Sequence, residues 1–589
     1  MKKLLVYFKD YKKECVLGPL FKLLEASFEL IVPLVMAAMI DIGVGEHNTS
    51  YIAGMSFLLV LLAVIGMVCS ITAQYFAAKA AVGGATKLRR ALFWHVESLA
   101  FQELDTVGTA TLITRLTSDV NQVQNGVNLV LRLFLRSPFI VIGAMVMAFT
   151  IDVPSALVFA VAIPLLSVVV FGVMLICIPI YKRVQNALDG VLGITRENLT
   201  GSRVIRAFHK QEEEQENFCG KNEALTKLQL FAGRISALMN PLTYLIINGA
   251  LIALLWTGAL GTDSGRITQG EVVALVNYMS QILVELVKLA SLIVSINKAA
   301  ACANRVAAVF EVQPSMAGEC AGGSERKTSA TESEERAADA CAVEFSHVGL
   351  TYQGAGEEAL TEIDFKANRG ETIGIIGGTG SGKSSVVQLI PRFYEATRGM
   401  VKVDGKDVRA YDLLELRGKI GVVPQKAVLF AGTIRENLKW GNPNASDEEL
   451  LAALETAQAR EVIEQKEGGL DYMLEQGGRN LSGGQRQRLT IARALVKKPE
   501  ILILDDSASA LDFATDARLR AAIAGLGSGM TVFIVSQRAA SIREADKIIV
   551  LEDGRIVGSG THEQLLLDCE VYQEIYESQF QKGTGGESV

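Results

Sequence analysis

The sequence has few residues of the kinds that bind metals or form disulfides. It contains 8 cysteines and 5 histidines among 589 residues, with no Cys-x-x-Cys pair and no histidine cluster. A zinc site or a disulfide framework is therefore not expected. The scattered cysteines fit free thiols in a reducing compartment.

The chain also lacks an excess of basic residues. It has 57 Lys and Arg against 64 Asp and Glu, a net charge of -7. This balance does not favour a nucleic-acid-binding protein. The first residues, MKKLLVYFKDYKKE, have no apolar core followed by a small-residue cleavage site, so a cleaved signal peptide is not expected.

Charge is missing altogether from three long stretches, at 51–78, 153–181 and 235–262. Each has about 28 residues, more than the roughly 20 that span a bilayer as a helix. Three weaker candidates, which do contain charges, lie near 16–41, 129–151 and 270–300. Together they predict six membrane-spanning helices, in keeping with a mean hydropathy of +0.29.

Lysine and arginine predict the orientation of these spans. They are concentrated in the N-terminal residues and in the long segments after the second and fourth spans, whereas the loops near 42–50, at Asp152 and near 261–270 have few. Cytoplasmic loops carry the excess of Lys and Arg. We therefore expect a multi-pass protein of the plasma (inner) membrane with both termini in the cytoplasm.

The remaining part of the chain, nearly half of its length, has a different character. Residues 312–340 are small, polar and charged without periodicity, as in a linker. From 341 to 580, short β-rich runs alternate with helical stretches, which predicts a soluble α/β domain with a largely parallel sheet. The sequence thus divides into a transmembrane domain (1–311), a linker (312–340), an α/β domain (341–580) and a tail (581–589).

A phosphate-binding loop lies at the start of this α/β domain. The sequence Gly377-x4-Gly382-Lys383-Ser384 follows a predicted strand and opens a predicted helix. Its backbone N–H groups and the helix N-terminus favour phosphate, the lysine reaches the β and γ phosphates, and the serine ligates Mg²⁺. The candidate ATP-binding residues here are Gly377, Gly378, Thr379, Gly380, Ser381, Gly382, Lys383, Ser384 and Ser385.

Two further motifs accompany this loop. Asp505 ends the apolar run ILILD and is a candidate Mg²⁺ ligand. The glycine-rich sequence LSGGQ opens another predicted helix; its candidate ATP-binding residues are Leu481, Ser482, Gly483, Gly484 and Gln485.

In this order the motifs resemble those of an ABC exporter half-transporter, and the resemblance covers nearly the whole chain. It implies an all-α transmembrane domain of six long helices followed by an α/β P-loop nucleotide-binding domain. It also implies that Tyr352 stacks on adenine, and that Gln425 is a catalytic and ATP-binding residue that contacts Mg²⁺ and the membrane domain. Asp512 would belong to the D-loop, and 101–120 and 197–211 resemble the regions around the two coupling helices. ATP and Mg²⁺ are the implied ligands.

Two positions depart from the family pattern. The family expects a glutamate after the Mg²⁺-binding aspartate, where this chain has Asp506, and a switch histidine where it has Gln537. The aspartate carboxylate falls short by about 1.5 Å, and a displacement near 1 Å can cost on the order of a hundredfold in rate. Glutamine cannot shuttle a proton as histidine does. The two catalytic positions therefore predict a degenerate site that hydrolyses ATP slowly or not at all.

The LSGGQ motif is nevertheless intact. In the family, two nucleotide-binding domains pair head to tail, so this motif would complete the ATP site of a partner. We therefore expect a heterodimer in which a second half-transporter supplies the catalytic glutamate and the switch histidine. A homodimer in which Asp506 is adequate is the alternative.

Charged residues within the predicted spans are candidates for substrate contacts. Glu25 and Glu29 share a face of the first span, and Glu285 and Lys288 are three residues apart in the sixth. Such charges often face a cavity. Alternatively they lie in water-filled space or pair with one another.

The predicted function is ATP-driven export of hydrophobic or drug-like compounds across the plasma membrane, with the lipid bilayer and a hydrophobic small molecule as partners. A leader-cleaving peptide exporter is disfavoured, since no peptidase domain is expected before the first span. The alternatives are a homodimeric lipid or peptide exporter or flippase, and an ATP-gated regulator that moves nothing.

Overall fold

The computed structural model describes residues 2–316, 341–507, 510–527 and 529–580. Most of the predicted linker and the predicted tail lie outside the described residues. The chain forms two compact units. The helical unit comprises Met1–Glu97 and Thr109–Gln313, and the α/β unit comprises Ser98–Gly108 and Pro314–Val589.

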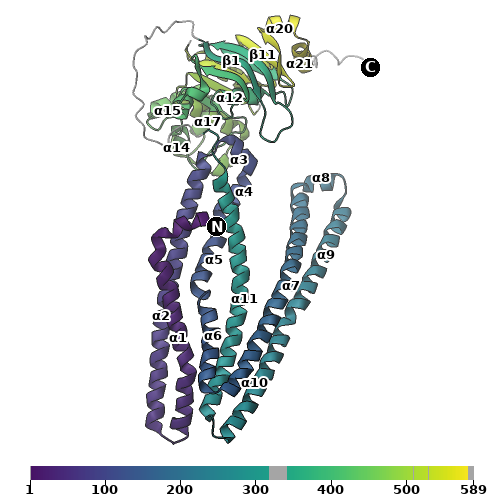
Figure 1. Ribbon diagram of the computed structural model, residues 1–589. Helices are drawn as coiled ribbons and strands as arrows, with labels where there is room; N and C mark the ends of the chain where they lie inside the picture. The colour runs from purple at the N-terminus through teal and green to yellow at the C-terminus, as the bar shows by residue number, and fades with distance from the viewer. Residues whose placement is uncertain (1, 317–340, 508–509, 528, 581–589) are drawn as a thin grey trace. The chain divides into compact units, whose positions relative to one another are not determined.

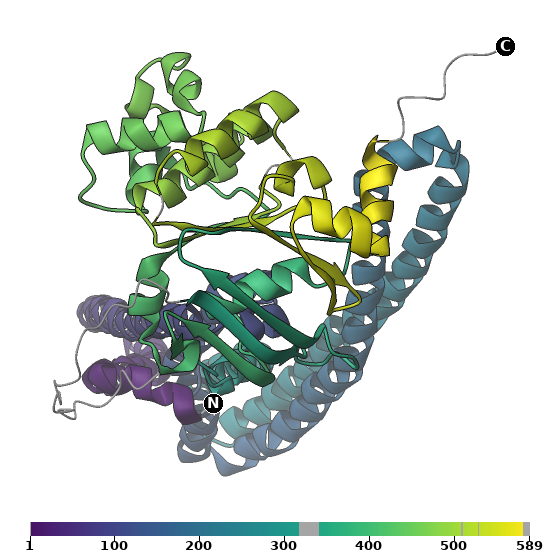
Figure 2. The ribbon, with the colours of Figure 1, turned by 90° about the horizontal axis from the view of Figure 1, so that it is seen from above.

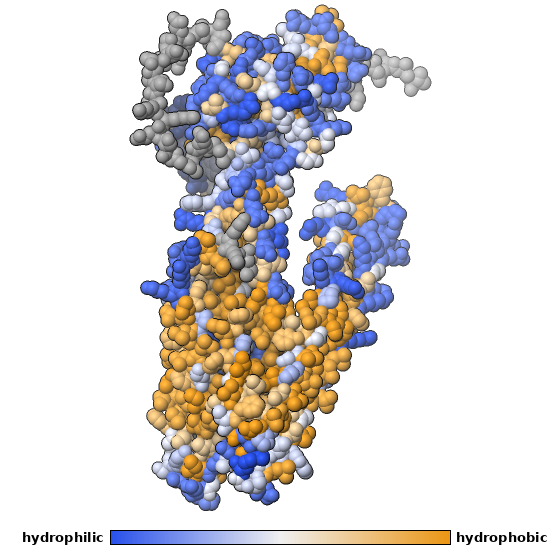
Figure 3. All heavy atoms as spheres, viewed as in Figure 1, coloured by the Kyte–Doolittle hydropathy of each residue, from blue (hydrophilic) through white to orange (hydrophobic). Residues whose placement is uncertain are grey.

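The helical unit has six helical spans long and apolar enough to cross a membrane (Figure 1). They are Leu4–Val44, Thr49–Ser98, Thr109–Ile151, Val153–Thr200, Gln211–Asp263 and Gln269–Glu311. At 1.5 Å per residue they extend about 60 to 80 Å, twice a hydrocarbon core or more. Figure 3 shows hydrophobic residues along the middle of this unit and hydrophilic residues towards its ends.

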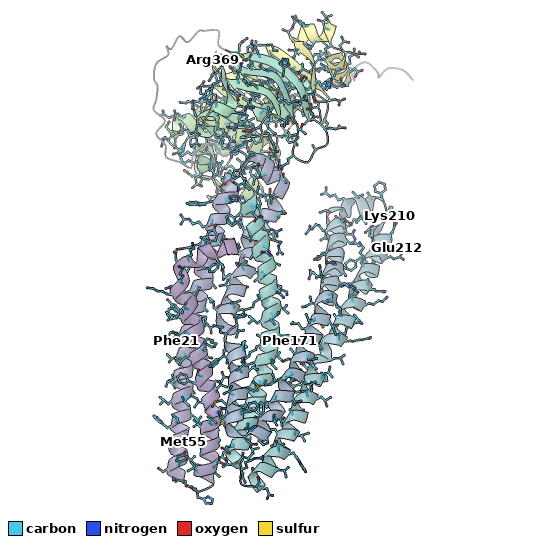
Figure 4. The ribbon with its side chains drawn as sticks, viewed as in Figure 1. Phe21, Met55, Phe171, Lys210, Glu212 and Arg369 are labelled. Carbon is cyan, nitrogen blue, oxygen red and sulfur yellow. The ribbon has the colours of Figure 1, made fainter. Side chains whose placement is uncertain are left out.

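Several of these spans are built from more than one helix. The main helices are α1 (Lys12–Ala38), α2 (Thr49–Ser98), α5 (Val120–Leu133), α6 (Arg136–Ile151), α7 (Val153–Thr200), α9 (Gln211–Ala237), α10 (Met239–Asp263) and α11 (Gln269–Glu311). The short helices are η1 (Lys2–Tyr11), η2 (Met39–Val44), α3 (Phe101–Val107), α4 (Thr109–Thr114), η3 (Arg115–Asp119) and α8 (Ser202–Ala207). Figure 4 labels Lys210 and Glu212 where α9 begins, just after α8.

Local sequence explains the tight connection between α6 and α7. Asp152 ends α6 in an extended conformation, and its carboxylate accepts a hydrogen bond from the Ser155 N–H, 3.0 Å away, at the start of α7. A side-chain acceptor of this kind satisfies a helix N–H group that would otherwise have no partner. The chain can therefore reverse direction across a single residue.

Small residues allow the helices to approach closely. Ala26, Ala144, Ala156 and Ala274 are fully buried in the core shared by α1, α6, α7, α10 and α11. Small side chains favour close helix packing in membranes, where apolar burial between helices gives little driving force.

The α/β unit contains a six-stranded sheet in the order β12-β11-β3-β10-β9-β6. Its strands are β3 (Thr372–Gly377), β6 (Ile420–Val423), β9 (Ile501–Asp505), β10 (Thr531–Val535), β11 (Lys547–Glu552) and β12 (Arg555–Gly560). All neighbours in this sheet are parallel except β11 and β12. The four inner strands are nearly all apolar, as expected for strands covered on both faces.

Two smaller sheets complete the strand set: β2-β1-β4-β5 and β7-β8. Their strands are β1 (Cys341–Leu350), β2 (Leu360–Asn368), β4 (Arg398–Val403), β5 (Lys406–Asp407), β7 (Gly432–Thr433) and β8 (Met473–Leu474). The helices of the unit are α12 (Lys383–Leu389), α13 (Leu413–Lys419), α14 (Ile434–Lys439), α15 (Asp447–Thr456), α16 (Arg460–Glu464), α17 (Gly483–Val496), α18 (Phe513–Ala524), α19 (Ala539–Ile542), α20 (His562–Asp568) and α21 (Glu570–Phe580). In Figure 2 the light-green helices between residues 434 and 496 gather to one side of the strands.

The predicted fold class is confirmed. An all-α region with six apolar spans precedes an α/β domain with a largely parallel sheet.

Candidate nucleotide-binding site

Four neighbouring parallel strands end at one edge of the large sheet. The phosphate-binding loop follows β3, Gln537 follows β10, Asp505 and Asp506 end β9, and Gln425 follows β6. Val535 of β10 lies opposite Ile375 of β3 and Asp505 of β9. Ligands of open α/β sheets bind at the carboxyl ends of the strands. The topology therefore brings the predicted phosphate, Mg²⁺ and catalytic residues to one place.

The loop between β3 and α12 depends on glycine. Gly380 and Gly382 have φ of 87° and 91°, a region that other L-residues rarely adopt. A Cβ on Gly382 would lie 2.6 Å from Leu360 Cδ2. Gly378, Thr379 and Gly380 are exposed, as a ligand-binding loop requires.

Lys383 is the buried cation of this loop. Its Nζ donates to the carbonyl oxygen of Gly377, 2.9 Å away, and also to that of Gly378. Burial lowers the pKa of the Lys383 amine, whereas the charges of Asp506 and Asp505 act in the opposite direction. The ammonium is thus held inside the loop, where phosphate oxygens would be stronger acceptors than the two carbonyls.

Ser384 and Asp505 form a pair of oxygen donors. Ser384 Oγ donates a hydrogen bond to Asp505 Oδ1 at 2.8 Å. Burial raises the pKa of the Asp505 carboxyl, since the protein interior stabilises the charged form less well than water does. A hydroxyl and a carboxylate at this spacing suit Mg²⁺, which prefers oxygen ligands. When bound, Mg²⁺ would neutralise charge on the phosphates.

Asp506 lies beside Gln425. The Gln425 Nε2 donates to Asp506 Oδ2 at 3.2 Å, and the Asp506 N–H donates to Val535 O at 3.0 Å. Asp506 has a φ of 45°, which aspartate tolerates better than most residues. The structure therefore places these two predicted catalytic residues together at the ends of β9 and β6.

Gln537 lies just beyond β10 and is exposed. Its backbone oxygen accepts a hydrogen bond from Gln579 Nε2 at 2.8 Å. Ser536, the residue before it, is bound to the P-loop strand through a 3.0 Å bond from its N–H to Ile375 O. The position of Gln537 is therefore fixed by its backbone.

Tyr352 lies over the helix that follows the P-loop. Its hydroxyl is 2.8 Å from Ser385 Oγ, and its ring packs edge-on against Tyr394, with centroids 5.1 Å apart. The predicted adenine-stacking residue is thus adjacent to the predicted phosphate loop.

The LSGGQ residues begin a different helix, α17. Ser482 and Gln485 form a capping box: Ser482 Oγ accepts from the Gln485 N–H at 3.3 Å, and Gln485 Oε1 accepts from the Ser482 N–H at 3.0 Å. Leu481 is buried in a core shared with α15, while α12 belongs to a separate core with β1 and β2. Within this chain, the P-loop and LSGGQ are therefore built on separate parts of the α/β unit.

Asp512 caps α18. Its carboxylate accepts from the Thr515 N–H at 2.7 Å, and this bond lowers the pKa of the Asp512 carboxyl. Residues 508–509, between Asp505 and this cap, lie outside the described residues.

A group of aromatic residues next to this site was not predicted from the sequence. Phe101 of α3 lies against Phe393, with ring centroids 4.7 Å apart, and Tyr394 Oη donates to the Asp105 carboxylate. Phe101, Tyr394 and Asp505 line one cavity of about 590 Å³. The sequence signal for this cavity is the pair of adjacent aromatic residues in PRFYE, shortly after the P-loop helix.

The predicted substrate residues separate into two groups. Arg136 bridges Glu29 and Glu285, with 2.7 Å to each carboxylate. Glu25 instead binds Lys22 at 2.6 Å.

The second predicted coupling region contains α8, whose neighbouring Phe208 is 73% exposed.

Comparisons with known proteins agree with this architecture. The model of the ABC transporter transmembrane region matches residues 15–286, and the ABC transporter model matches residues 360–509. An "Uncharacterized ABC transporter ATP-binding protein" of Mycobacterium tuberculosis is 34% identical over 583 residues, covering 98% of both chains. The "Putative multidrug export ATP-binding/permease protein YgaD" of Bacillus subtilis is 30% identical, covering 96% of this chain and 97% of YgaD.

A solved structure shares the fold. The structure of a bacterial Atm1-family ABC exporter with ATP bound has a TM-score of 0.76 and 21% sequence identity, covering 98% of this chain and 99% of that one. The extent of the sequence match decides the family: this chain belongs to the ABC transporters, as a half-transporter with its transmembrane and ATP-binding domains in one polypeptide.

Proposed function

We propose that this chain is one subunit of a heterodimeric ABC exporter that moves hydrophobic or drug-like compounds out across the plasma membrane. Its own ATP site would be degenerate, and its LSGGQ motif would complete the catalytic site of a different half-transporter. Both termini would lie in the cytoplasm.

The observation that carries this proposal is the pair Asp506 and Gln537 beside an intact P-loop. Gln425 donates a hydrogen bond to the Asp506 carboxylate at 3.2 Å. The Asp506 side chain is one methylene shorter than the glutamate implied by the family. Gln537 can donate a hydrogen bond but cannot shuttle a proton. Such a site binds ATP through Lys383 and Ser384 and activates water poorly.

The location of LSGGQ supports the need for a second subunit. Leu481 and the P-loop helix belong to separate hydrophobic cores of the α/β unit. In head-to-tail pairing this motif faces the ATP bound by the partner. The chain has all the LSGGQ residues but lacks the glutamate and histidine that support hydrolysis. This combination fits a subunit that completes the partner's ATP site and hydrolyses its own ATP poorly.

The direction and cargo rest on similarity. YgaD is named as a putative multidrug export protein, and the match covers nearly the whole length of both chains. The cavity shared by Phe101, Tyr394 and Asp505 supports energy coupling, since α3 and the candidate Mg²⁺ residue line the same space.

The test is the ATPase activity of the purified full chain in lipid nanodiscs. We expect almost no turnover from the wild type and at least a tenfold gain, roughly, from the Asp506→Glu/Gln537→His double variant. Lys383→Ala added to the double variant should abolish the gain. Brisk wild-type turnover that is lost in Asp506→Asn would show that Asp506 is adequate and that no second subunit is needed.

A further inference from the structure

The helical unit contains a pocket between α1 and α11 that the ATP chemistry does not use. Its volume is about 310 Å³. Val32 and Met36 contribute apolar surface, whereas Glu29, Gln281, Glu285 and Lys288 contribute polar groups. A pocket of this size with an apolar wall and a few polar groups is typical of a small-molecule site.

Glu29 and Glu285 of this pocket, and Arg136, which bonds to both of them, lie within the candidate membrane spans. Glu29, Arg136 and Glu285 lie 15 or 16 residues from Val44, Ile151 and Gln269, where their helical segments end. At 1.5 Å per residue this corresponds to about 22 to 24 Å, within the roughly 30 Å of a hydrocarbon core. Ionisable residues within a membrane span are expensive and usually functional.

Glu285 has all the donors that it needs. It accepts from Arg136 Nη1 at 2.7 Å, Ser137 Oγ at 2.7 Å and Lys288 Nζ at 2.8 Å. Glu285 and Arg136 are both buried. These bonds join α6 and α11, and they account for Glu285 as a structural anchor for its neighbours.

Glu29 is different, because it faces the pocket with capacity to spare. Only its Oε2 accepts from Arg136, at 2.7 Å, and the side chain is 41% exposed. Nearby, the buried Oε1 of Gln281 has no hydrogen-bond partner among the described residues. A buried carbonyl without a donor is costly, so this position is suited to a ligand N–H.

The free hydrogen-bond acceptors of the pocket lining favour a ligand that donates. The carboxylates of Glu29 and Glu285 are balanced by the charges of Arg136 and Lys288, which already bond them, but Glu29 Oε1 and Gln281 Oε1 stay without a donor among the described residues. An anion would meet these carboxylates, whereas a cation would find Glu29 and the carbonyl of Gln281 as acceptors. The apolar wall of Val32 and Met36 suits a hydrocarbon or aromatic body.

We propose that this pocket binds the protonated amine of an amphiphilic molecule, with Glu29 and Gln281 as the residues that recognise it. The proposal rests on the proposed export function, for which it names a chemical class of cargo. It assigns Arg136 to positioning, since its guanidinium holds the Glu29 carboxylate at the pocket wall.

The experiment measures binding of dansylcadaverine, a fluorescent amphiphile with a primary amine, and of its uncharged N-acetyl derivative. The full chain in lipid nanodiscs is titrated without nucleotide, with empty nanodiscs subtracted. We expect Glu29→Gln to weaken dansylcadaverine binding at least about tenfold, because a hydrogen-bonded charge pair is lost. Binding of the N-acetyl derivative should change less than about twofold.

Two variants make this result specific. Gln281→Leu should also weaken the amine selectively. Glu14→Gln is the control, since Glu14 is also on α1 and bound to a lysine, Lys79, at 3.0 Å, but lies outside the pocket; it should leave both affinities unchanged. Glu29→Gln is expected to fold, because its amide oxygen still accepts from Arg136.

Three results would overturn the proposal. Glu29→Gln could lower the affinities for both probes equally, or lower neither of them. The wild type could also show no saturable binding, as expected for a pocket that holds only water. The assay requires neither hydrolysis nor a second subunit. The binding result would therefore stand even if the chain does not form the proposed heterodimer. Equally, a failure to bind the amine would not contradict the heterodimer.

Discussion

Tyr394 donates a hydrogen bond from its hydroxyl to the carboxylate of Asp105, 289 residues away in sequence. The bond joins α3 to the segment after the P-loop helix, within the α/β unit, where Phe101 and Phe393 also meet. Burial, together with Asp105, raises the pKa of the Tyr394 hydroxyl. The hydroxyl therefore keeps its proton at neutral pH and the bond remains available.

Removing this hydroxyl should loosen α3. In Tyr394→Phe the ring contacts remain, but the bond to Asp105 is lost, at a cost of about 1 kcal/mol. Amide hydrogen exchange in residues 98–108 should become roughly fivefold faster. Tyr411→Phe is a matched control, since its hydroxyl bonds Val403 O at 3.0 Å within the same unit. Unchanged exchange in Tyr394→Phe would show that the aromatic contacts alone hold α3.

Gly382 should not accept a side chain. Its φ of 91° and the 2.6 Å approach to Leu360 mean that Gly382→Ala strains the backbone by about 1–2 kcal/mol and displaces the P-loop. We expect weaker binding of a fluorescent ATP analogue and a lower unfolding temperature of the full chain. Gly378→Ala is the stability control, since its Cβ would meet no atom within 4 Å. Equal unfolding temperatures for the two variants would contradict the steric argument.

Asp505 and Asp512 should affect stability with opposite signs. Because the folded chain raises the pKa of Asp505 above its ordinary 3.8, its contribution favours folding at low pH and is lost as the pH rises through the folded pKa. Without Mg²⁺ and nucleotide, Asp505→Asn should therefore unfold at a higher temperature than wild type near pH 7. The difference should shrink as the pH approaches 3.8.

The pKa of Asp512 is instead lowered from 3.8 by its bond to Thr515, so its stabilisation exists above that pH and is lost as the pH falls through the folded pKa. Asp512→Asn should therefore unfold at a lower temperature near pH 7 and converge on wild type in acid. Scanning calorimetry of the full chain with EDTA, at pH 7 and pH 4, measures both variants. A shift of the same sign in both would contradict this assignment.

The sequence predicted that the candidate ATP-binding residues would lie together, because their positions follow from the backbone topology. A P-loop needs its glycines and lysine at fixed spacing, and Asp505 had to end a buried strand. Since parallel strands end at a common edge, β3, β6, β9 and β10 brought their motifs together without further information. The sequence could not predict that Gln425 would contact Asp506, because that depends on how the segment after β6 turns.

The six spans were also predictable, since long apolar stretches have few alternatives to crossing a bilayer. Hydropathy alone indicated how many spans there are but not which of their faces meet. Glu29, Arg136 and Glu285 come from three helices, and separations of 107 and 149 residues divide the arginine from its two partners. Sequence by itself therefore determined the domain plan and the nucleotide motifs. Tertiary packing alone decided that Glu285 is a saturated anchor while Glu29 faces a pocket, because hydrogen-bond capacity depends on which neighbours the folded helices bring within reach.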